Sequence, residues 1–314
     1  MKAMVMTAFG GPEVFQAQDL PVPEPGLGQL RVRVYATAVN PLDYKIRAGK
    51  SRRRIAEPPA VIGYDAAGMV EALGPGARRF QPGDAVFYSP RLTGPGTCAE
   101  YHVVDEDVVA AKPHNLDFIQ AAGLPLAGCT AWDAVTFFQL RPGHAALIHA
   151  GAGGVGSLAV QMARASGARV LATCRAANSD LVRDLGAEPI DYRAEDFAAA
   201  VLRLTDGRGV EAVYDTVGGD TLERSLACVR PYARLAGIVN VTGNLNPAYL
   251  KNATIYLGFM ERAGHKIEAL RVLAEGGWIH PVIDSVLPLE QVAEAHRRLE
   301  AGGVRGKIVL KVGE

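Results

Sequence analysis

The feature that most constrains this chain is the stretch at residues 145–169, which reads AALIHAGAGGVGSLAVQMARASGAR. Its first four residues are an apolar run, short enough for a buried strand. The residues after the glycines have the apolar spacing of a helix. A second apolar segment, residues 168–173, follows that helix. The stretch therefore predicts a strand, a glycine turn, a helix and a return strand.

The turn contains the glycines that the pattern G-x-G-x-x-G requires, Gly151, Gly153 and Gly156, together with Gly154. Gly151 allows a tight turn, Gly153 lets a pyrophosphate approach the backbone, and Gly156 lets the helix lie close to the strand. The N–H groups of the first helical turn have no intrahelical acceptor, so they attract phosphate. This context predicts dinucleotide binding. A tight turn in another kind of α/β protein is the alternative.

Length and composition are those of a globular protein with two domains. The chain has 314 residues, of which 49% are hydrophobic and 21% are charged. Its formal net charge is zero, which gives no reason to expect nucleic acid or a membrane surface as partner. No apolar run is long enough to span a membrane. The four cysteines form no C-x-x-C pair, so we expect free thiols in the cytoplasm and no zinc.

The first part of the chain, up to about residue 115, has the character of a β-rich, barrel-like domain. Alternating apolar and charged residues, or short apolar runs, are separated by turns rich in Gly and Pro. The expected strands are residues 1–9, 30–39, 61–70, 84–88, 99–104 and 108–113.

From Asp117 the pattern changes to alternating helices and strands. After helices at residues 118–123 and 130–139, we expect strands at 169–173, 189–191, 212–215 and 233–239, with helices at 179–185, 194–205 and 220–229 between them. This alternation indicates parallel strands joined by crossover helices, which form a doubly wound sheet.

The last part of the chain returns to the character of the first. A helix at 265–275 is followed by extended chain at 282–288, a helix at 289–301 and a strand at 307–312. The sequence thus predicts an α/β protein with two domains. Residues 1–116 and 281–314 form the β-rich domain, and residues 117–280 form the nucleotide-binding domain.

The choice of nucleotide depends on the end of the second strand of the nucleotide-binding domain. Folds of this type that select NAD place a carboxylate there for the ribose 2′-hydroxyl. Here the strand ends Thr173-Cys174-Arg175, and a guanidinium suits the 2′-phosphate of NADPH. Asn178 and Tyr192 lie on the same rim and could add donors. If Arg175 is only a solvated cation, the choice between NADPH and NADH stays open.

Several segments, in matching order, resemble the medium-chain dehydrogenase/reductase superfamily, in its zinc-independent quinone oxidoreductase branch. The resemblance covers essentially the whole chain and is carried by residues 39–47, 59–68, 80–86, 130–132, 149–156 and 215–219. It implies a GroES-like catalytic domain followed by a Rossmann domain, with the active cleft between them, and a homodimer.

The resemblance also indicates which residues stand where zinc alcohol dehydrogenases hold their catalytic metal. Those positions correspond to Asn40 and to Tyr64-Asp65. Asparagine and tyrosine cannot replace thiolate and imidazole as zinc ligands, so we expect no metal. Without a Lewis acid, alcohol dehydrogenation is disfavoured, whereas hydride transfer to a quinone or an α,β-unsaturated carbonyl remains feasible.

We expect Asn40, Tyr44 and Tyr64 to be the candidate catalytic residues. Asn40 would lie near the nicotinamide, and Tyr44 or Tyr64 would donate a hydrogen bond or a proton to the acceptor. Structural roles are the alternatives: Asn40 shapes a turn, Asp43 caps the helix that follows, and Tyr44 belongs to the core. His149, which precedes the glycines, is expected to be structural.

The resemblance implies further contacts with the cofactor. Thr130 would lie on the nicotinamide side, and Gly153, Gly154 and Val155 would lie at the pyrophosphate. The remaining contacts implied are Val217, Val239, Asn240, Val241 and Lys307. Lys307 could also be an ordinary edge-strand lysine. The basic run at residues 50–54 could guide an anionic ligand, although a solvated loop fits it better.

Two other functions remain open. An enoyl-thioester reductase uses a similar fold and a tyrosine donor, but the sequence shows no basic groove for a phosphopantetheine arm. A non-catalytic NADPH-binding protein is the alternative from another class, although Asn40 and Tyr44 beside an intact glycine loop favour activity. Residues 240–259 are shorter than in many relatives, which leaves the size of the acceptor open.

Overall fold

The computed structural model describes residues 1–51 and 55–313, so residues 52–54 of the basic run lie outside the description. The chain divides into two compact units. The first contains Met1–Leu126 and Arg262–Glu314, and the second contains Ala127–Glu261. Residues 117–126 and 262–280, which the sequence assigned to the nucleotide-binding domain, lie in the first unit. In the described chain, no helix is long and apolar enough to cross a membrane.

The second unit is built on a six-stranded parallel sheet with the order β11-β10-β9-β12-β13-β14. Numbered from β9, this order is 3-2-1-4-5-6, as in dinucleotide-binding folds. The order in which strands are added to the sheet therefore reverses between β9 and β12, and folds of this kind bind their ligand at that point. The strands are β9 Ala145–Ile148, β10 Arg169–Cys174, β11 Glu188–Asp191, β12 Val210–Asp215, β13 Val229–Gly237 and β14 Thr254–Leu257.

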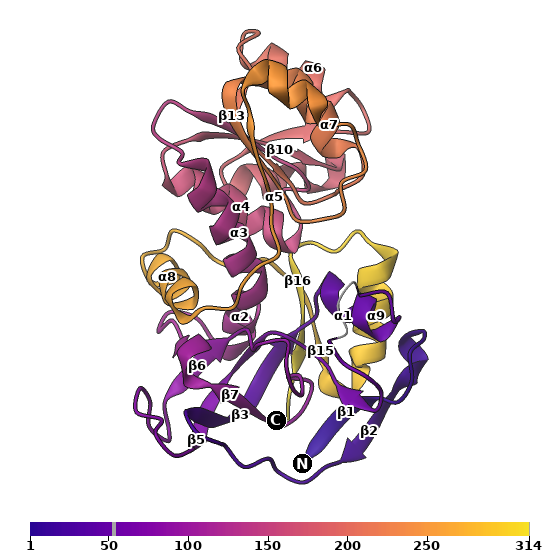
Figure 1. Ribbon diagram of the computed structural model, residues 1–314, viewed down its shortest axis with the longest axis vertical. Coiled ribbons are helices and arrows are strands. Elements are labelled where there is room, and N and C mark those ends of the chain that lie inside the picture. Colours follow the sequence, from indigo (N-terminus) through magenta and orange to yellow (C-terminus); the bar gives the residue numbers. More distant parts are fainter. Residues whose placement is uncertain (52–54, 314) are drawn as a thin grey trace. The chain divides into compact units, whose positions relative to one another are not determined.

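Crossover helices connect these strands and contribute to their core (Figure 1). Helix α6 begins at a side-chain cap, because the Asp196 side chain accepts a hydrogen bond from Ala199 N–H at 2.9 Å. Their apolar faces bury residues such as Phe197 and Val201. The helices are α4 Gly154–Ala165, α5 Ser179–Asp184, α6 Phe197–Leu204 and α7 Thr221–Ser225, and α3 Pro125–Phe138 precedes the first strand.

The first unit contains a seven-stranded sheet and a three-stranded sheet. In the larger sheet, the long strand β3 pairs with β5, β7 and β16, all antiparallel. The smaller sheet has the order β2-β1-β4. The strands are β1 Lys2–Met6, β2 Phe15–Asp19, β3 Gln29–Ala38, β4 Ala60–Val61, β5 Ala66–Leu73, β6 Ala85–Tyr88, β7 Tyr101–Asp105, β8 Val109–Ala111, β15 Ile283–Pro288 and β16 Lys307–Lys311.

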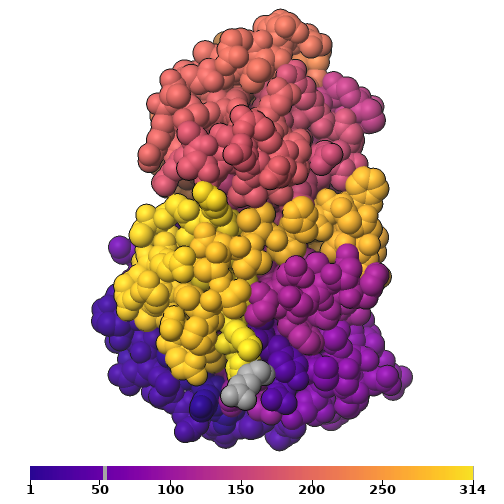
Figure 2. Space-filling view, turned by 180° about the vertical axis from the view of Figure 1, so that it is seen from behind, coloured from indigo at the N-terminus to yellow at the C-terminus, as the bar shows by residue number. Residues whose placement is uncertain are grey.

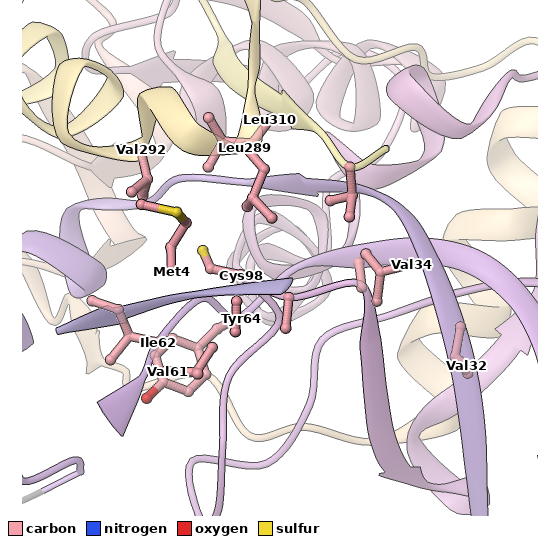
Figure 3. Packing of buried hydrophobic residues seen from close by; sticks show 14 of the residues in the cluster. Met4, Val32, Val34, Val61, Ile62, Tyr64, Cys98, Leu289, Val292 and Leu310 are labelled. Carbon is pink, nitrogen blue, oxygen red and sulfur yellow. The ribbon is translucent and has the colours of Figure 1, made fainter. Parts of the chain in front are cut away.

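The two ends of the chain share one hydrophobic core in this unit. Met4 from β1, Val34 from β3, Val292 from α9 and Leu310 from β16 belong to a single buried cluster (Figure 3). In the space-filling view, the yellow C-terminal segment covers part of the indigo N-terminal segment (Figure 2). The helices of this unit are α1 Pro41–Arg47, α2 Phe118–Ala122, α8 Gly264–Glu275 and α9 Val292–Ala301.

The single strand predicted for residues 61–70 is wrong. The chain forms two strands, β4 and β5, separated by residues 62–65. Gly63 in this break has a φ of +116°, which a strand does not adopt. The carbonyl oxygen of Asp65 accepts hydrogen bonds from the hydroxyls of Thr37 at 2.6 Å and Thr97 at 2.8 Å. Side chains rather than a neighbouring strand therefore satisfy this backbone group.

Candidate active site

The glycine turn of the second unit lies between β9 and α4, as predicted. A Cβ on Gly151 would lie 2.6 Å from the Cβ of Ala172, and one on Gly156 would collide with the carbonyl oxygen of Ala150. Gly153 is the N-cap residue of α4 and has no side chain to cap the helix. The first-turn N–H groups, including those of Gly154 and Val155, are thus left for another acceptor. These features fit a dinucleotide pyrophosphate.

The predicted rim of the nucleotide site comes together at the ends of two paired strands. Cys174 of β10 lies opposite Asp191 of β11, so the residues that follow each strand are neighbours. Arg175 Nε donates a hydrogen bond to the Tyr192 hydroxyl at 3.5 Å, and both side chains are exposed. Asn178 N–H bonds to the carbonyl of Arg175 at 2.8 Å. The structure therefore brings Arg175, Asn178 and Tyr192 to one place.

Positive charge gathers at this rim. Hydrogen bonding from Arg175 lowers the pKa of Tyr192 below its usual range, and Arg193 acts in the same direction. Arg193 was not among the residues predicted for this rim, although it directly follows Tyr192. A site with two guanidinium groups near one phenol suits an anion such as a phosphate.

The residues predicted near the ribose and the carboxamide of the nicotinamide half follow the carboxyl ends of β12 and β13. Val217 and Gly218 N–H donate to Asp215 Oδ1 at 2.8 and 2.9 Å, which fixes the turn after β12. Gly219 forms a parallel bridge with Val241. Strand β13 ends at Gly237 rather than at Val239, so Val239, Asn240 and Val241 lie in the segment that follows it. Val217 is 54% exposed and can contact a ligand.

Thr130 belongs to helix α3 and is mostly buried. Its backbone carbonyl accepts a hydrogen bond from the Tyr214 hydroxyl of β12 at 2.9 Å. This bond ties α3 to the central sheet of the same unit.

His149, which directly follows β9, is buried. Its ring nitrogens lie 3.2 Å from Thr173 Oγ1 and 2.9 Å from Ser225 Oγ. Burial lowers its pKa to about 3, so the ring is neutral at pH 7. A buried, neutral and fully hydrogen-bonded imidazole has the structural role that the sequence analysis expected.

In the first unit, Asn40 is joined to Lys307 and Asp65 in a buried cluster, which we call the amide clamp. Lys307 Nζ donates to Asn40 Oδ1 at 2.5 Å and to Asp65 Oδ2 at 3.1 Å. Asn40 Nδ2 donates to Asp65 Oδ2 at 2.8 Å. All three side chains are at least 95% buried. No local pattern in the sequence predicts this contact, since 267 positions separate Asn40 from Lys307.

The buried carboxyl group of Asp65 is stabilised by hydrogen bonds from several donors. Burial raises the pKa of Asp65, and the Lys307 ammonium and the bonds from Asn40 and Leu126 N–H oppose that rise. Leu126 N–H donates to Asp65 Oδ1 at 2.6 Å. Each carboxylate oxygen therefore has a donor, as a buried charge requires.

Asp43 lies next to the clamp on α1 and has an unusual environment. Its Oδ2 accepts a hydrogen bond from Asn40 N–H at 2.6 Å, whereas its Oδ1 has no hydrogen-bond partner among the described residues. Burial raises its pKa to about 7, against the positive charges of Lys307 and Arg262. The predicted capping role of Asp43 is thus confirmed, and the carboxyl also titrates near neutral pH.

The two candidate tyrosines differ in their surroundings. Tyr44 on α1 is half-buried, and burial raises the pKa of its hydroxyl. Tyr64 is fully buried in the hydrophobic cluster, where Figure 3 shows it near Val61 and Ile62. Its hydroxyl has no hydrogen-bond partner within the described part of the chain. Tyr44 is therefore the more accessible of the two.

A buried arginine anchors the helix that carries these residues. Arg47 Nε donates to the Gly10 carbonyl at 3.0 Å, and its Nη2 donates to Glu300 Oε1 at 2.8 Å. Its Nη1 lies 3.2 Å from Nδ1 of His296. Burial lowers the pKa of His296 to about 3, so the ring is neutral and can accept this bond. Helix α1 is thereby fixed against α9.

Among the residues that the structure describes, no three His, Cys, Asp or Glu side chains gather as metal ligands do. The cysteines are free and buried. The arrangement instead offers an anion site and glycine turn in one unit and an amide clamp in the other.

Comparison with known proteins assigns the chain to a family. Residues 26–114 match the alcohol dehydrogenase GroES-like domain, and residues 185–310 match the family described as zinc-binding dehydrogenase. The chain is 37% identical over 328 residues to a quinone oxidoreductase of Pseudomonas aeruginosa, covering 98% of this chain and 99% of the relative. It is 34% identical to an NADPH-dependent alkenal/one oxidoreductase of Arabidopsis thaliana, covering 99% and 79%.

Solved structures agree with this assignment. The structure of an NAD-dependent alcohol dehydrogenase is similar to this chain, with a TM-score of 0.94 at 36% identity and 100% coverage of both chains. The GroES-like unit and the Rossmann unit are those that the sequence predicted. The chain therefore belongs to the medium-chain dehydrogenase/reductase superfamily, in its quinone oxidoreductase branch.

Proposed function

We propose that this protein is an NADPH-dependent oxidoreductase that transfers a hydride to a quinone or an α,β-unsaturated aldehyde or ketone. The observation that carries the proposal is the amide clamp. Asn40 and Asp65 stand at positions that resemble the metal-ligand positions of zinc alcohol dehydrogenases, and here they bind the ammonium of Lys307. Without a Lewis acid, the reaction needs an acceptor that is already electrophilic. Relatives named for quinones and for alkenals support this class.

The second unit provides the proposed cofactor site. The N–H groups of Gly154 and Val155 bind the pyrophosphate, and Gly151 and Gly153 leave room for it. The 2′-phosphate is bound by the exposed side chains of Arg175, Tyr192 and Asn178. The nicotinamide half is flanked by Thr130, Val217, Val239, Asn240 and Val241.

When bound, NADPH supplies the hydride, and the protein orients the acceptor and excludes water. We propose that Asn40 and Tyr44 take part in the reaction, and that Lys307 supports Asn40. The half-buried Tyr44 hydroxyl donates a hydrogen bond or proton to the acceptor oxygen, where negative charge develops. Tyr64 is a weaker candidate because it has no exposed surface.

We further propose that activity needs no zinc and that the protein is a cytoplasmic homodimer. Strand β14 is at the edge of its sheet, and Leu257 in it is 57% exposed, which suits pairing with a second copy. Four buried, free cysteines suit a reducing compartment.

The test measures NADPH and NADH oxidation against a panel of quinones, enals, enones and enoyl-CoA, after dialysis against a zinc chelator. We expect turnover of quinones or enones with NADPH, unchanged by the chelator. Preference for enoyl-CoA would favour the enoyl-thioester reductase. Tight NADPH binding without turnover of any acceptor would favour a non-catalytic binding protein.

A further inference from the structure

The residue that opens the glycine turn of the second unit has a strained backbone. Ala150 has a φ of +52°, a left-handed conformation that is unfavourable for a residue with a side chain. Its N–H donates to Thr173 Oγ1 at 3.0 Å, and its carbonyl accepts from Gly153 N–H at 2.9 Å. Gly151 N–H donates to the Thr173 carbonyl at 2.9 Å. The end of β10 therefore holds the start of the turn at two points.

The direction of each hydrogen bond around His149 follows from its partners. Ser225 Oγ donates its one hydrogen to the Thr221 carbonyl at 2.7 Å, because a carbonyl can only accept. Ser225 must then accept from His149 Nε2, which lies 2.9 Å away. Burial lowers the pKa of His149 to about 3, so the ring is neutral and Nδ1 carries no proton. Nδ1 therefore accepts from the Thr173 hydroxyl at 3.2 Å.

These bonds form a chain with a single direction, from Ala150 N–H through the Thr173 hydroxyl and the His149 ring to α7. Because the hydrogen of Thr173 points to His149, a lone pair of its oxygen is left for Ala150. Successive hydrogen bonds of this kind strengthen one another. The hydroxyl of Thr216, in the segment after β12, also donates to the His149 carbonyl at 2.8 Å. The chain thus joins the glycine turn to the segment after β12 within the second unit.

We propose that Thr173 and His149 are positioning residues, which hold Ala150 in its left-handed conformation and thereby set the affinity of the turn for the nucleotide. The inference rests on the proposed function for the nucleotide bound there. Neither side chain needs to touch the nucleotide. If Ala150 relaxes to a negative φ, the N–H groups at the start of α4 change direction, and the turn must regain its strained form before it binds. Such a requirement lowers the apparent affinity.

The first test compares two substitutions of Thr173. Dissociation constants of NADPH and NADH are measured by protein fluorescence, and melting temperatures are measured without nucleotide. We expect Thr173→Val to weaken the binding of both nucleotides about tenfold, the value of one hydrogen bond. The loss should be equal because both nucleotides contain the same pyrophosphate. Thr173→Ser keeps the hydroxyl and should bind within about twofold of the wild type.

Thr205→Val is a matched control in the same unit. Thr205 is also buried, and its hydroxyl accepts from Gly209 N–H at 2.9 Å. Gly209 directly precedes β12, whereas the glycine turn follows the carboxyl end of the neighbouring strand β9. Thr205→Val should lower the melting temperature and change the dissociation constants by less than about twofold, because distant sites act independently.

A glycine at position 150 separates positioning from other effects of Thr173→Val. Glycine adopts a positive φ without strain, so the turn should no longer need the hydroxyl. We expect Ala150→Gly, added to Thr173→Val, to return binding to within about threefold of the wild type. No recovery would overturn the proposal, because the loss would not then arise from the conformation of Ala150.

His149→Phe tests the second link of the chain. It removes the acceptor at Nδ1 and keeps an aromatic ring against Phe197, whose ring centroid lies 4.9 Å or less from that of His149, at 4.7 Å. We expect binding to weaken about threefold to tenfold in the wild type, with no further loss in Thr173→Val, because His149 acts through Thr173. Equal loss in both backgrounds would overturn the role of His149.

A lowered melting temperature of Thr173→Val with unchanged dissociation constants would show that the chain is only structural. If Thr173→Val does not fold, the recovery by Ala150→Gly is measured on His149→Phe instead. Absence of nucleotide binding in the wild type would contradict the proposed function itself. Wild-type binding that is unchanged in Thr173→Val would overturn the positioning role alone.

Discussion

Lys307 Nζ lies 2.5 Å from Asn40 Oδ1, and Lys307 comes from the last strand of the first unit whereas Asn40 precedes its first α-helix. Neither residue is more than 5% exposed. This contact places a side-chain cation between a buried amide and a buried carboxylate. It also makes the orientation of one amide depend on two distant segments of the chain.

The choice of cofactor should depend on Arg175. We expect Arg175→Asp to weaken NADPH binding about tenfold to hundredfold, because a charge-assisted bond to the 2′-phosphate is replaced by repulsion. NADH binding should change little. Fluorescence titration with both nucleotides measures the effect, and Arg203→Asp on α6 is a matched control with the same change of charge. Equal loss for NADH and NADPH would argue against a 2′-phosphate contact.

Substitution by alanine should affect nucleotide binding at one glycine of the turn and stability at another. Gly153 has a φ of −83°, and the nearest atom to an added Cβ is Ala150 O at 3.3 Å. Gly153→Ala should therefore fold but weaken NADPH binding, since the methyl group meets the pyrophosphate. In Gly156→Ala the Cβ would collide with backbone, so the melting temperature itself should fall. Thermal unfolding without nucleotide separates the two effects, and a large loss of stability in Gly153→Ala would contradict this assignment.

Asp43 should make stability depend on pH. Its pKa of about 7 in the folded protein lies above the ordinary 3.8, so the folded state keeps a proton that the unfolded state releases. This contribution is present below about pH 4 and is lost as the pH rises through about 7.

The free energy of unfolding of the wild type should therefore decline relative to Asp43→Asn over that range, by at most about 1.4 kcal/mol per pH unit. Urea unfolding at a series of pH values measures the difference. Parallel curves for the two proteins would show that Asp43 titrates normally.

Tyr44→Phe should lower kcat/KM for enones by about a hundredfold, the lower end of the usual value of a general acid. NADPH binding should be retained, because the half-buried hydroxyl faces the acceptor in this proposal. Steady-state kinetics at saturating NADPH provide the measurement. A variant with full kcat/KM would remove the donor role and leave a positioning role open.

Tyr64→Phe is the matched comparison for Tyr44→Phe. Because the Tyr64 hydroxyl is buried without a hydrogen-bond partner in the described chain, its removal should raise stability by about 1–3 kcal/mol. Activity should not change. A large loss of kcat/KM would indicate that the Tyr64 hydroxyl takes part in catalysis.

The sequence predicted the second unit well because its signals are local. The apolar run of β9, the glycine turn and the alternation of strands and helices are each contained in short segments, and the strand order follows from them. Arg175 and Tyr192 were placed on one rim for the same reason: each directly follows a parallel strand.

Other features depend on contacts between distant segments. The strands β2 and β14 were not predicted, since their short sequences, FQAQD and TIYL, pair only once neighbouring strands are in place. The break between β4 and β5 depends on hydroxyls from Thr37 and Thr97. The amide clamp needs Lys307 to meet Asp65, 242 positions away, and no local pattern encodes that distance.

Strand β16 has a consequence for how the protein is made. During synthesis on the ribosome, every residue of the Rossmann unit has been added before Lys307 is translated, because residues 127–261 precede β16. The hydrogen bond between Lys307 and Asn40 can therefore form only after the second unit has been synthesised. A translation product stopped before β16 would contain every residue of the second unit but would lack the lysine that donates hydrogen bonds to Asn40 and Asp65 in the first.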